Sequence, residues 1–169
     1  MSTLQRLFSQ PVDSETEEAI LQLLHAKTAS AVAMFVQAVR AAEAIYGPEA
    51  PERLRQWMLE RAVARAAERG AGPGGNSLRA YCEAMDRGCR GSHEWEKLED
   101  SDHRQAYRYT RCLWADIYRA LGAEDIGLWI CQADGPVVAA YNPRIRFQRT
   151  QTLMAGDACC DHAYVEEDE

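Results

Sequence analysis

The sequence predicts an α+β domain in which N-terminal helices pack on a small antiparallel sheet of about four strands. From Ser14 to about Arg90, apolar residues recur with helical spacing. After Ser92 the spacing changes, and stretches of period-two alternation stand on either side of further helical segments. The length of 169 residues suits one domain. We therefore expect a single domain over 1–169, with frayed ends at 1–13 and 166–169, a helical part at 14–90 and a mixed part at 92–165.

The first helix is predicted to begin at Ser14, because Ser14 and Glu17 have the spacing of a capping box. It should end at Tyr46, where Gly47 and Pro48 follow. We expect a bend or break at Thr28-Ala29-Ser30. The predicted core face of this helix consists of apolar residues at helical spacing, namely Ile20, Leu23, Leu24, Ala31, Met34, Phe35, Ala38, Ala42 and Ile45.

Two more helices complete the helical part. The second is expected to start at Pro51, a favourable residue for a first turn, and to stop at Gly70. The glycine-rich loop at 70–76 follows, and it lacks the Lys and Ser/Thr of a phosphate-binding loop. Ser77 is then placed to cap a third helix, whose apolar face is predicted to hold Leu78, Tyr81, Cys82 and Met85.

The mixed part is predicted to alternate between hairpins and helices. Two antiparallel strands should flank the polar turn at 99–102, the second of them at 105–111. A short helix at 113–121 and another at about 124–134 follow, and Gly135-Pro136 should interrupt the latter. The remaining elements are a strand within 144–153, a turn at Gly156-Asp157 and a final strand at 160–165.

Composition and charge narrow the possible partners. The net charge is −7, and four of the negative charges lie in the last four residues, 166–169. Nucleic-acid binding usually requires a basic face, so we expect no nucleic-acid partner. No purely apolar run approaches the roughly 20 residues of a membrane span, and the first ten residues do not read as a secretory signal. We therefore expect a cytoplasmic protein with no membrane partner.

Six cysteines in a chain without an export signal should be thiols, metal ligands or catalytic groups. Cys112 stands where a strand enters a helix, Cys131 one turn before Asp134, and Cys160 just after the Gly156-Asp157 turn. If the two hairpins pack side by side, these three thiols can meet. Cys159 should face away from Cys160 on a strand, and simple packing is expected of the two remaining cysteines, Cys82 and Cys89.

Four segments together resemble the L-2-amino-thiazoline-4-carboxylic acid hydrolase family. They are T-R-C-L-W-A-D at 110–116, C-Q-A-D at 131–134, Y-N-P-R-I-R-F-Q-R-T-Q-T-L at 141–153 and G-D-A-C-C-D at 156–161. The resemblance covers roughly residues 95–165, and no motif of this kind occurs in the first 90 residues. Where the family usually has an aromatic residue after the last Cys-Asp pair, this chain has His162.

The resemblance implies hydrolytic opening of a five-membered cyclic isothiourea to N-carbamoyl-cysteine. Attack at ring carbon 2 needs a nucleophile, which Cys112, Cys131 or Cys160 could supply as a thiolate, or else an activated water. Proton transfer and pairing with an amidinium suit Asp134 or Asp157. The substrate carboxylate suits the guanidinium fork of Arg149 or Arg146. Whether a thiolate or water attacks is left open.

Three further residues are expected to help bind the substrate or tune a thiol. Arg111 adjoins Cys112 and could lower the pKa of its thiol, and His162 could raise the thiolate fraction of Cys160 from the same strand face. Asn142 lies in the third matching segment and is a candidate for substrate binding. No cofactor is assigned. An alternative is zinc or iron held by Cys112, Cys131 and Cys160, with His162 or Asp134 as a further ligand.

Two other functions stay open. A non-catalytic small-molecule sensor is one, because the cysteine placement loosely resembles vinyl-reductase-type sensor domains. A metal-dependent enzyme of another reaction type is the second. The first helix also has apolar residues beyond its predicted core face, at Ala29, Val32, Val36 and Val39. A helix apolar over so wide an arc needs more than one neighbour, which predicts a homodimer.

Overall fold

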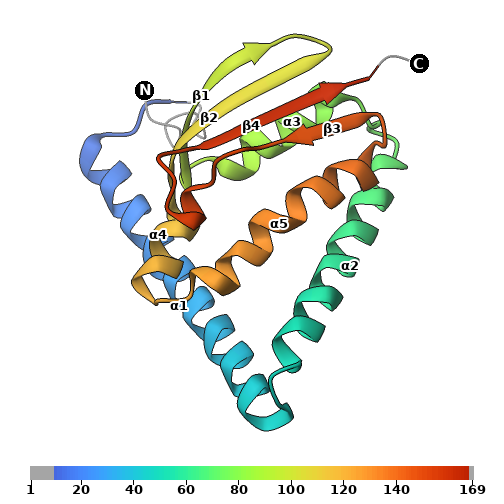
Figure 1. Ribbon diagram of the computed structural model, residues 1–169. Helices are drawn as coiled ribbons and strands as arrows, with labels where there is room; N and C mark the ends of the chain where they lie inside the picture. Colours follow the sequence, from blue (N-terminus) through green and yellow to red (C-terminus); the bar gives the residue numbers. More distant parts are fainter. Residues whose placement is uncertain (1–9, 168–169) are drawn as a thin grey trace.

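The computed structural model describes residues 10–167 and has the predicted α+β architecture. A four-stranded antiparallel sheet lies at one end of the molecule, α5 crosses beneath it, and α1 and α2 run away from it to a shared tip (Figure 1). The strand order is β1-β2-β4-β3. The elements are α1 (Ser14–Tyr46), α2 (Ala50–Gly70), α3 (Leu78–Cys89), β1 (His93–Asp100), β2 (Arg104–Cys112), α4 (Leu113–Ala120), α5 (Glu124–Tyr141), β3 (Ile145–Gln148), η2 (Leu153–Ala155) and β4 (Cys160–Glu166).

Helix α1 begins at the predicted residue but uses a different cap. The Asp13 carboxylate accepts hydrogen bonds of 2.8 Å from both the amide and the hydroxyl of Thr16, so Asp13 is the cap and Ser14 is the first helical residue. The expected break at 28–30 does not occur, and the helix runs unbroken for 33 residues. The alanines that flank this segment favour helix strongly enough to carry Thr28 and Ser30 through it.

The face of α1 that meets the core is only in part the predicted one, because Leu24 and Phe35 pack against the core but most of the other predicted residues do not. Val32, Val36 and Val39 are buried against α4 and α5. The exposed fractions of Leu23, Met34 and Ile45 are 60%, 69% and 70%, so these members of the predicted core face point to solvent. Both faces are apolar at helical spacing, and spacing alone does not say which of them turns inward.

By length and composition, α1 is the one helix within residues 10–167 that could cross a membrane. The sequence contains no uninterrupted apolar run long enough to cross a membrane. The mean hydropathy of α1 nevertheless reaches the level of a membrane-spanning helix, because its small polar residues lower it only slightly. The core helices of water-soluble domains pass the same test. In this fold α1 contributes its valines to the core of an α+β domain.

Helix α2 ends at Gly70 because this glycine lies directly against the end of α5. A Cβ built on Gly70 would stand 2.0 Å from the carbonyl oxygen of Tyr141 and 2.9 Å from its carbonyl carbon. No side chain fits there, so the glycine allows the two helix ends to touch. Beyond the loop, Ser77 caps α3 as predicted by accepting a hydrogen bond from the Ala80 amide at 3.2 Å.

Helix α5 does not stop at Gly135-Pro136, which corrects the predicted interruption. It continues to Tyr141 with Pro136 inside it. Proline removes one helical hydrogen bond, but Val138 and Tyr141 are buried against the sheet side, and their packing outweighs that local cost. The longer α5 therefore packs along β3 at one edge of the sheet (Figure 1).

The predicted strand within 144–153 is much shorter than expected. Pairing in β3 stops at Gln148, because the Asp161 carboxylate accepts the amides of Thr150 and Gln151 at 2.8 and 2.6 Å and turns the chain away from the sheet. The segment then forms the short 3-10 helix η2. The last strand starts at Cys160 as predicted, with Cys160 opposite Tyr109 and His162 opposite Tyr107.

Candidate functional site

Three thiols from three separate elements meet beneath the sheet. Cys112 ends β2, Cys131 lies on α5 and Cys160 begins β4. The Thr152 hydroxyl joins two of them, because it donates to Cys131 Sγ at 3.8 Å and accepts from Cys160 Sγ at 3.6 Å. Cys112 lies close enough to interact electrostatically with both of the others. We call Cys112, Cys131 and Cys160 the thiol cluster.

Burial keeps two thiols of the cluster, Cys112 and Cys131, protonated. Burial raises the pKa of the Cys112 thiol to about 11, although the backbone amides of Trp114 and Ala115 at the start of α4 oppose that effect. Burial also raises the pKa of Cys131. Cys160 receives a hydrogen bond of 3.2 Å from the Leu153 amide to its Sγ. At neutral pH the thiols of Cys112 and Cys131 are therefore mainly neutral, and amide groups that can stabilise a thiolate lie next to Cys112.

An ion pair stands beside the cluster. Arg149 donates to the Asp134 carboxylate at 2.8 Å and to the Cys131 carbonyl oxygen at 3.0 Å. Burial raises the pKa of Asp134 to about 6, even though the Arg149 charge acts in the opposite direction. A carboxyl group that titrates so close to neutral pH suits proton transfer, and both groups lie within the segments that carry the family resemblance.

His162 behaves as an aromatic residue rather than as a cation. Its ring centroid lies 4.9 Å from that of Tyr109 and 5.1 Å from that of Phe147. Burial, and secondarily the Arg149 charge, lower the pKa of His162 to about 4, so its ring is neutral at neutral pH. Its Nδ1 lies 3.3 Å from the Tyr164 hydroxyl, whereas the Cys160 thiol donates to Thr152. A neutral imidazole thus occupies the position where the family usually has an aromatic ring.

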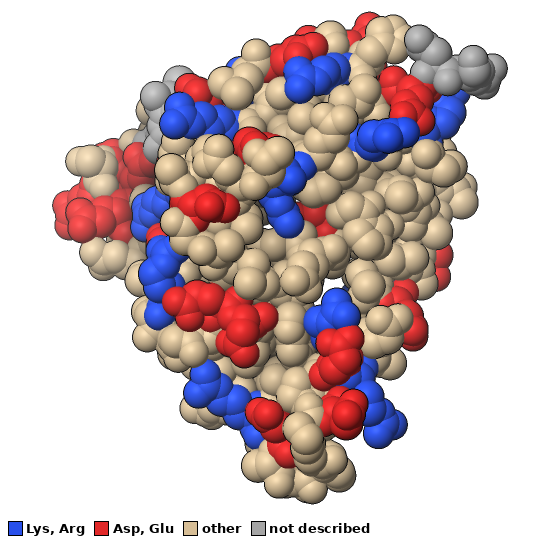
Figure 2. Space-filling model, viewed as in Figure 1, with Lys and Arg blue, Asp and Glu red and all other residues tan. Residues whose placement is uncertain are grey.

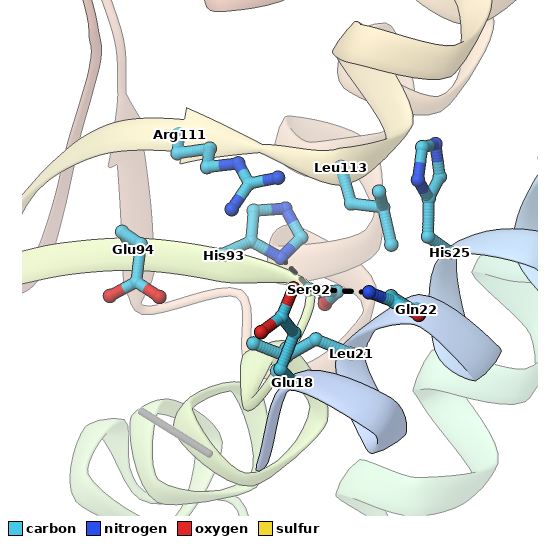
Figure 3. Close-up of a pocket in the computed structure, with 10 residues that line it drawn as sticks. Glu18, Leu21, Gln22, His25, Ser92, His93, Glu94, Arg111 and Leu113 are labelled. Carbon is cyan, nitrogen blue, oxygen red and sulfur yellow. Dashed lines mark hydrogen bonds between the residues drawn. The ribbon is translucent and has the colours of Figure 1, made fainter. Parts of the chain in front are cut away.

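Arg111 does not approach the thiol cluster. Adjacent residues on a strand point to opposite faces, so Arg111 leaves the sheet on the other side from Cys112. Its guanidinium Nε lies 3.4 Å from the Asp116 carboxylate. Figure 3 shows it beside His93 in a separate small pocket of about 160 Å³, which the N-terminal part of α1 also lines. Sequence adjacency to Cys112 misled the prediction, because the strand geometry separates the two side chains.

Two other predicted site residues have structural partners. Asn142 is buried at the far end of α5, where it donates to the Asn76 carbonyl at 2.8 Å and accepts from the Arg144 amide at 2.9 Å. It ties the loop after α2 to the start of β3. Asp157 accepts the Thr152 amide at 2.7 Å, so it holds the residue that links the thiols rather than lying among them.

The alternative cation, Arg146, pairs with Glu167 on the exposed edge of the sheet. Arg149 is therefore the predicted arginine that lies beside the cluster. One residue that sequence reasoning missed, Thr152, lies there as well, and Cys89 packs nearby as a core residue. Thr152 stands within the third matching segment, which is the signal that could have found it. Cys89, at the end of α3, interacts electrostatically with Cys112.

The zinc or iron alternative is not matched by the geometry. Within residues 10–167, no group of three or more His, Cys, Asp or Glu side chains is arranged to hold a metal ion. The Thr152 hydroxyl stands between the thiols of Cys131 and Cys160, and Asp134 is turned toward Arg149. We derive no chemical step through a metal.

Comparison with known proteins assigns the family. The family model for L-2-amino-thiazoline-4-carboxylic acid hydrolase matches residues 27–164. The chain belongs to this family. The match extends from within α1 to the end of β4, so the helical part that shows no recognisable motif is part of the family's domain, and the resemblance over 95–165 underestimated its extent. A search of the curated proteins gave no match.

The fold is shared with a sensory protein of known structure. The phenol-responsive sensory domain of the transcription activator PoxR, solved with phenol, superposes with a TM-score of 0.50. The two sequences are 13% identical, and the match covers 79% of this chain and 73% of that one. This likeness concerns the fold alone.

Proposed function

We propose that the protein is a hydrolase that opens the ring of a 2-amino-thiazoline-4-carboxylate-like substrate at the thiol cluster. The observation that carries the proposal is the meeting of Cys112, Cys131 and Cys160 beside the Asp134–Arg149 ion pair. Family membership supports the same chemistry. All six cysteines are free thiols, which suits a reaction in the reducing cytoplasm.

The Asp134–Arg149 pair is complementary to such a substrate. The substrate has a carboxylate at ring carbon 4 and an amidine-like group at carbon 2. In our proposal the carboxylate takes the place of Asp134 on the Arg149 fork, and the released Asp134 carboxylate faces the amidinium. A resident ion pair that exchanges with a zwitterion leaves no buried charge unpaired before or after binding.

Cys112 is the best-placed nucleophile of the three thiols. It directly precedes α4, where amides of the first turn can stabilise a thiolate, while burial alone keeps the free thiol protonated. The arrival of an amidinium supplies the positive charge that the free site lacks beside Cys112. Ionisation is then favoured only when the substrate is bound.

The reaction proceeds in two balanced steps. The Cys112 sulfur forms a bond to carbon 2, the bond from carbon 2 to the ring sulfur breaks, and the ring sulfur takes the proton that Cys112 loses. Water then adds to the same carbon with Asp134 as the base, the Cys112 sulfur leaves and regains a proton, and N-carbamoyl-cysteine is released. In this scheme Thr152 orients Cys131 and Cys160 around the reacting carbon.

The direct test is turnover of L-2-amino-thiazoline-4-carboxylate by the purified protein. Mass spectrometry should detect a product heavier than the substrate by one water, and reaction in ¹⁸O-labelled water should place one labelled oxygen in the carbamoyl group. The Cys82→Ala variant should behave like the wild type, because Cys82 packs in the core away from the cluster. Absence of any product at high protein concentration would exclude this substrate.

A second candidate is a small-molecule sensor without catalysis. The shared fold with a phenol-responsive sensory domain and the neutral state of the buried thiols favour it. Titration calorimetry separates the two functions, because a sensor would bind the thiazoline or a phenol and leave it chemically unchanged. Binding accompanied by continuous heat from product formation would favour the hydrolase.

A further inference from the structure

A second cavity lies on the opposite side of α5 from the thiol cluster. It is a cleft of about 540 Å³ between α1, α2 and α5, within the size range of small-molecule pockets. Figure 2 shows the surface hollowed between α5 and α2, with charged side chains at its edge. The walls are mostly apolar and hold three aromatic rings, those of Phe35, Trp57 and Trp129.

The two aromatic walls of the cleft differ in how well they are supported. Phe35 and Trp129 pack edge to face, with ring centroids 6.2 Å apart, and so form a firm wall between α1 and α5. Trp57 on α2 faces them across the cleft, and 59% of its surface is exposed. A large apolar ring exposed at the mouth of a cavity gains most from an occupant that covers it.

The cleft also carries two uncompensated positive charges. Arg61 and Arg65 on α2 line it. Within residues 10–167 neither guanidinium group forms an ion pair, although Arg65 Nε donates to the Arg61 carbonyl oxygen at 3.3 Å. The other charges in the lining are already paired: Arg55 with Glu52, and Asp134 with Arg149. An anionic group that enters the cleft would therefore meet two guanidinium groups without a carboxylate partner in the described part of the chain, and the carboxylate in the lining, Asp134, is already paired with Arg149.

The cleft and the thiol cluster use different faces of α5. Trp129, Ile130 and Ala133 line the cleft, whereas Cys131 turns toward Thr152 beneath the sheet. Of the residues discussed for the thiol site, only Asp134 also lines the cleft. A ligand in the cleft would consequently not occupy the place of the thiazoline.

We propose that this cleft binds an aromatic carboxylate that is larger than the thiazoline. Its ring system would lie between Trp57 and the Phe35–Trp129 wall, and its carboxylate would lie against Arg61 and Arg65. The apolar walls supply the affinity, and the two guanidinium groups select an anion over a neutral molecule of the same shape. This site is distinct from the thiol cluster, and Asp134 is the one residue that borders both.

The test uses naphthalene-2-carboxylate as the probe and its neutral amide, naphthalene-2-carboxamide, as the matched control. Calorimetry on the wild type should show one site per chain that prefers the carboxylate. The double variant Arg61→Gln/Arg65→Gln should weaken carboxylate binding by about tenfold or more and leave carboxamide binding unchanged. Arg53→Gln, on the same helix but outside the cleft lining, should bind both like the wild type.

Two further variants and a light-scattering measurement complete the test of the cleft. Trp57→Ala should weaken both probes, because it removes a wall, and Cys112→Ala should bind both normally, because the thiol cluster lies across α5. Unchanged carboxylate affinity in the arginine double variant would overturn the proposal. So would a wild-type protein that binds neither probe while light scattering gives a dimeric mass that Trp57→Ala abolishes, since a second copy would then occupy the cleft.

Discussion

The two sides of α5 contrast in what surrounds them. On the sheet side, Cys160 packs among buried tyrosines, and Cys112 and Cys131 pack against the core formed by α1, α4 and η2. Burial raises the pKa values of Cys112, Cys131 and Asp134. On the α1–α2 side, Trp57 and Ile130 are exposed, and within residues 10–167 Arg61 and Arg65 have no carboxylate partner. The contrast indicates that one helix separates a closed site suited to changing protonation states from an open cleft suited to selecting a ligand by shape and charge.

The largest effect on stability is expected where the end of α2 touches the end of α5, because this contact fixes one end of the cleft. Gly70→Ala puts a methyl group against the Tyr141 backbone, which cannot move aside as a flexible side chain can. We expect the free energy of unfolding to fall by about 3 kcal/mol, measured by urea denaturation. Gly74→Ala is the control, since nothing lies within 4 Å of its Cβ position, and its change should stay within about 0.5 kcal/mol. Equal stabilities for the two variants would contradict the close helix contact.

The pH dependence of kcat/KM tests the role of Asp134 on the sheet side. If its carboxylate acts as the base, kcat/KM should be low below pH 6 and should rise to a plateau as the group ionises around its pKa of about 6. Asp134→Asn should lower kcat/KM by about 100-fold or more and remove that inflection. Asp116→Asn, which alters the exposed pair with Arg111, should keep it. An inflection that persists in Asp134→Asn would assign the base elsewhere.

A third prediction concerns the pH dependence of stability that the buried, neutral ring of His162 should cause. Its pKa is about 4 when folded and near 6.5 when unfolded, so the unfolded chain binds the proton first as the pH falls. The free energy of unfolding should therefore fall as the pH is lowered from 6.5 to 4. At pH 4.5 this loss should amount to about 2 kcal/mol. His162→Phe keeps an aromatic ring and should lose that much less stability than the wild type between pH 7 and 4.5 in urea denaturation. An identical loss in both proteins would show that His162 does not cause it.

The smallest effect is expected from the hydroxyl that joins two thiols. Thr152→Val keeps the shape of the side chain but removes its contacts with Cys131 and Cys160. We expect kcat to fall about tenfold and the free energy of unfolding to fall by about 1 kcal/mol. Thr152→Ser retains the hydroxyl and should restore most of the rate. Equal rates for the valine and serine variants would leave the hydroxyl without a role in catalysis.

Local signals predicted much of the fold. Gly70 ends α2, Ser77 caps α3 and the Gly156 turn precedes β4, because each of these depends on a few neighbouring residues. Long-range packing decided the rest. The apolar faces of α1 compete for the core, and α5 continues through Pro136 because residues beyond it are buried against the sheet.

In the candidate site, too, local sequence signals predicted some features and long-range packing decided the others. The family motifs and the order of elements were enough to group Cys112, Cys131 and Cys160, but they left the arginine beside them open between Arg149 and Arg146. Arg111 was nevertheless misplaced, although the alternation of neighbouring residues along a strand already implies that it points away from Cys112. The motifs also could not reveal the Arg61–Arg65 cleft, which exists only because α1 and α2 diverge from α5 in space (Figure 1).

The most direct test of the shared thiol site is the turnover of L-2-amino-thiazoline-4-carboxylate by six single Cys→Ala variants. Alanine leaves only a small void, so the variants should remain folded, with losses of about 1 kcal/mol. Replacement in the thiol cluster, at Cys112, Cys131 or Cys160, should reduce kcat/KM by several orders of magnitude. Replacement of Cys82, Cys89 or Cys159 should leave it near the wild-type value. Full activity in both Cys131→Ala and Cys160→Ala would contradict a shared thiol site.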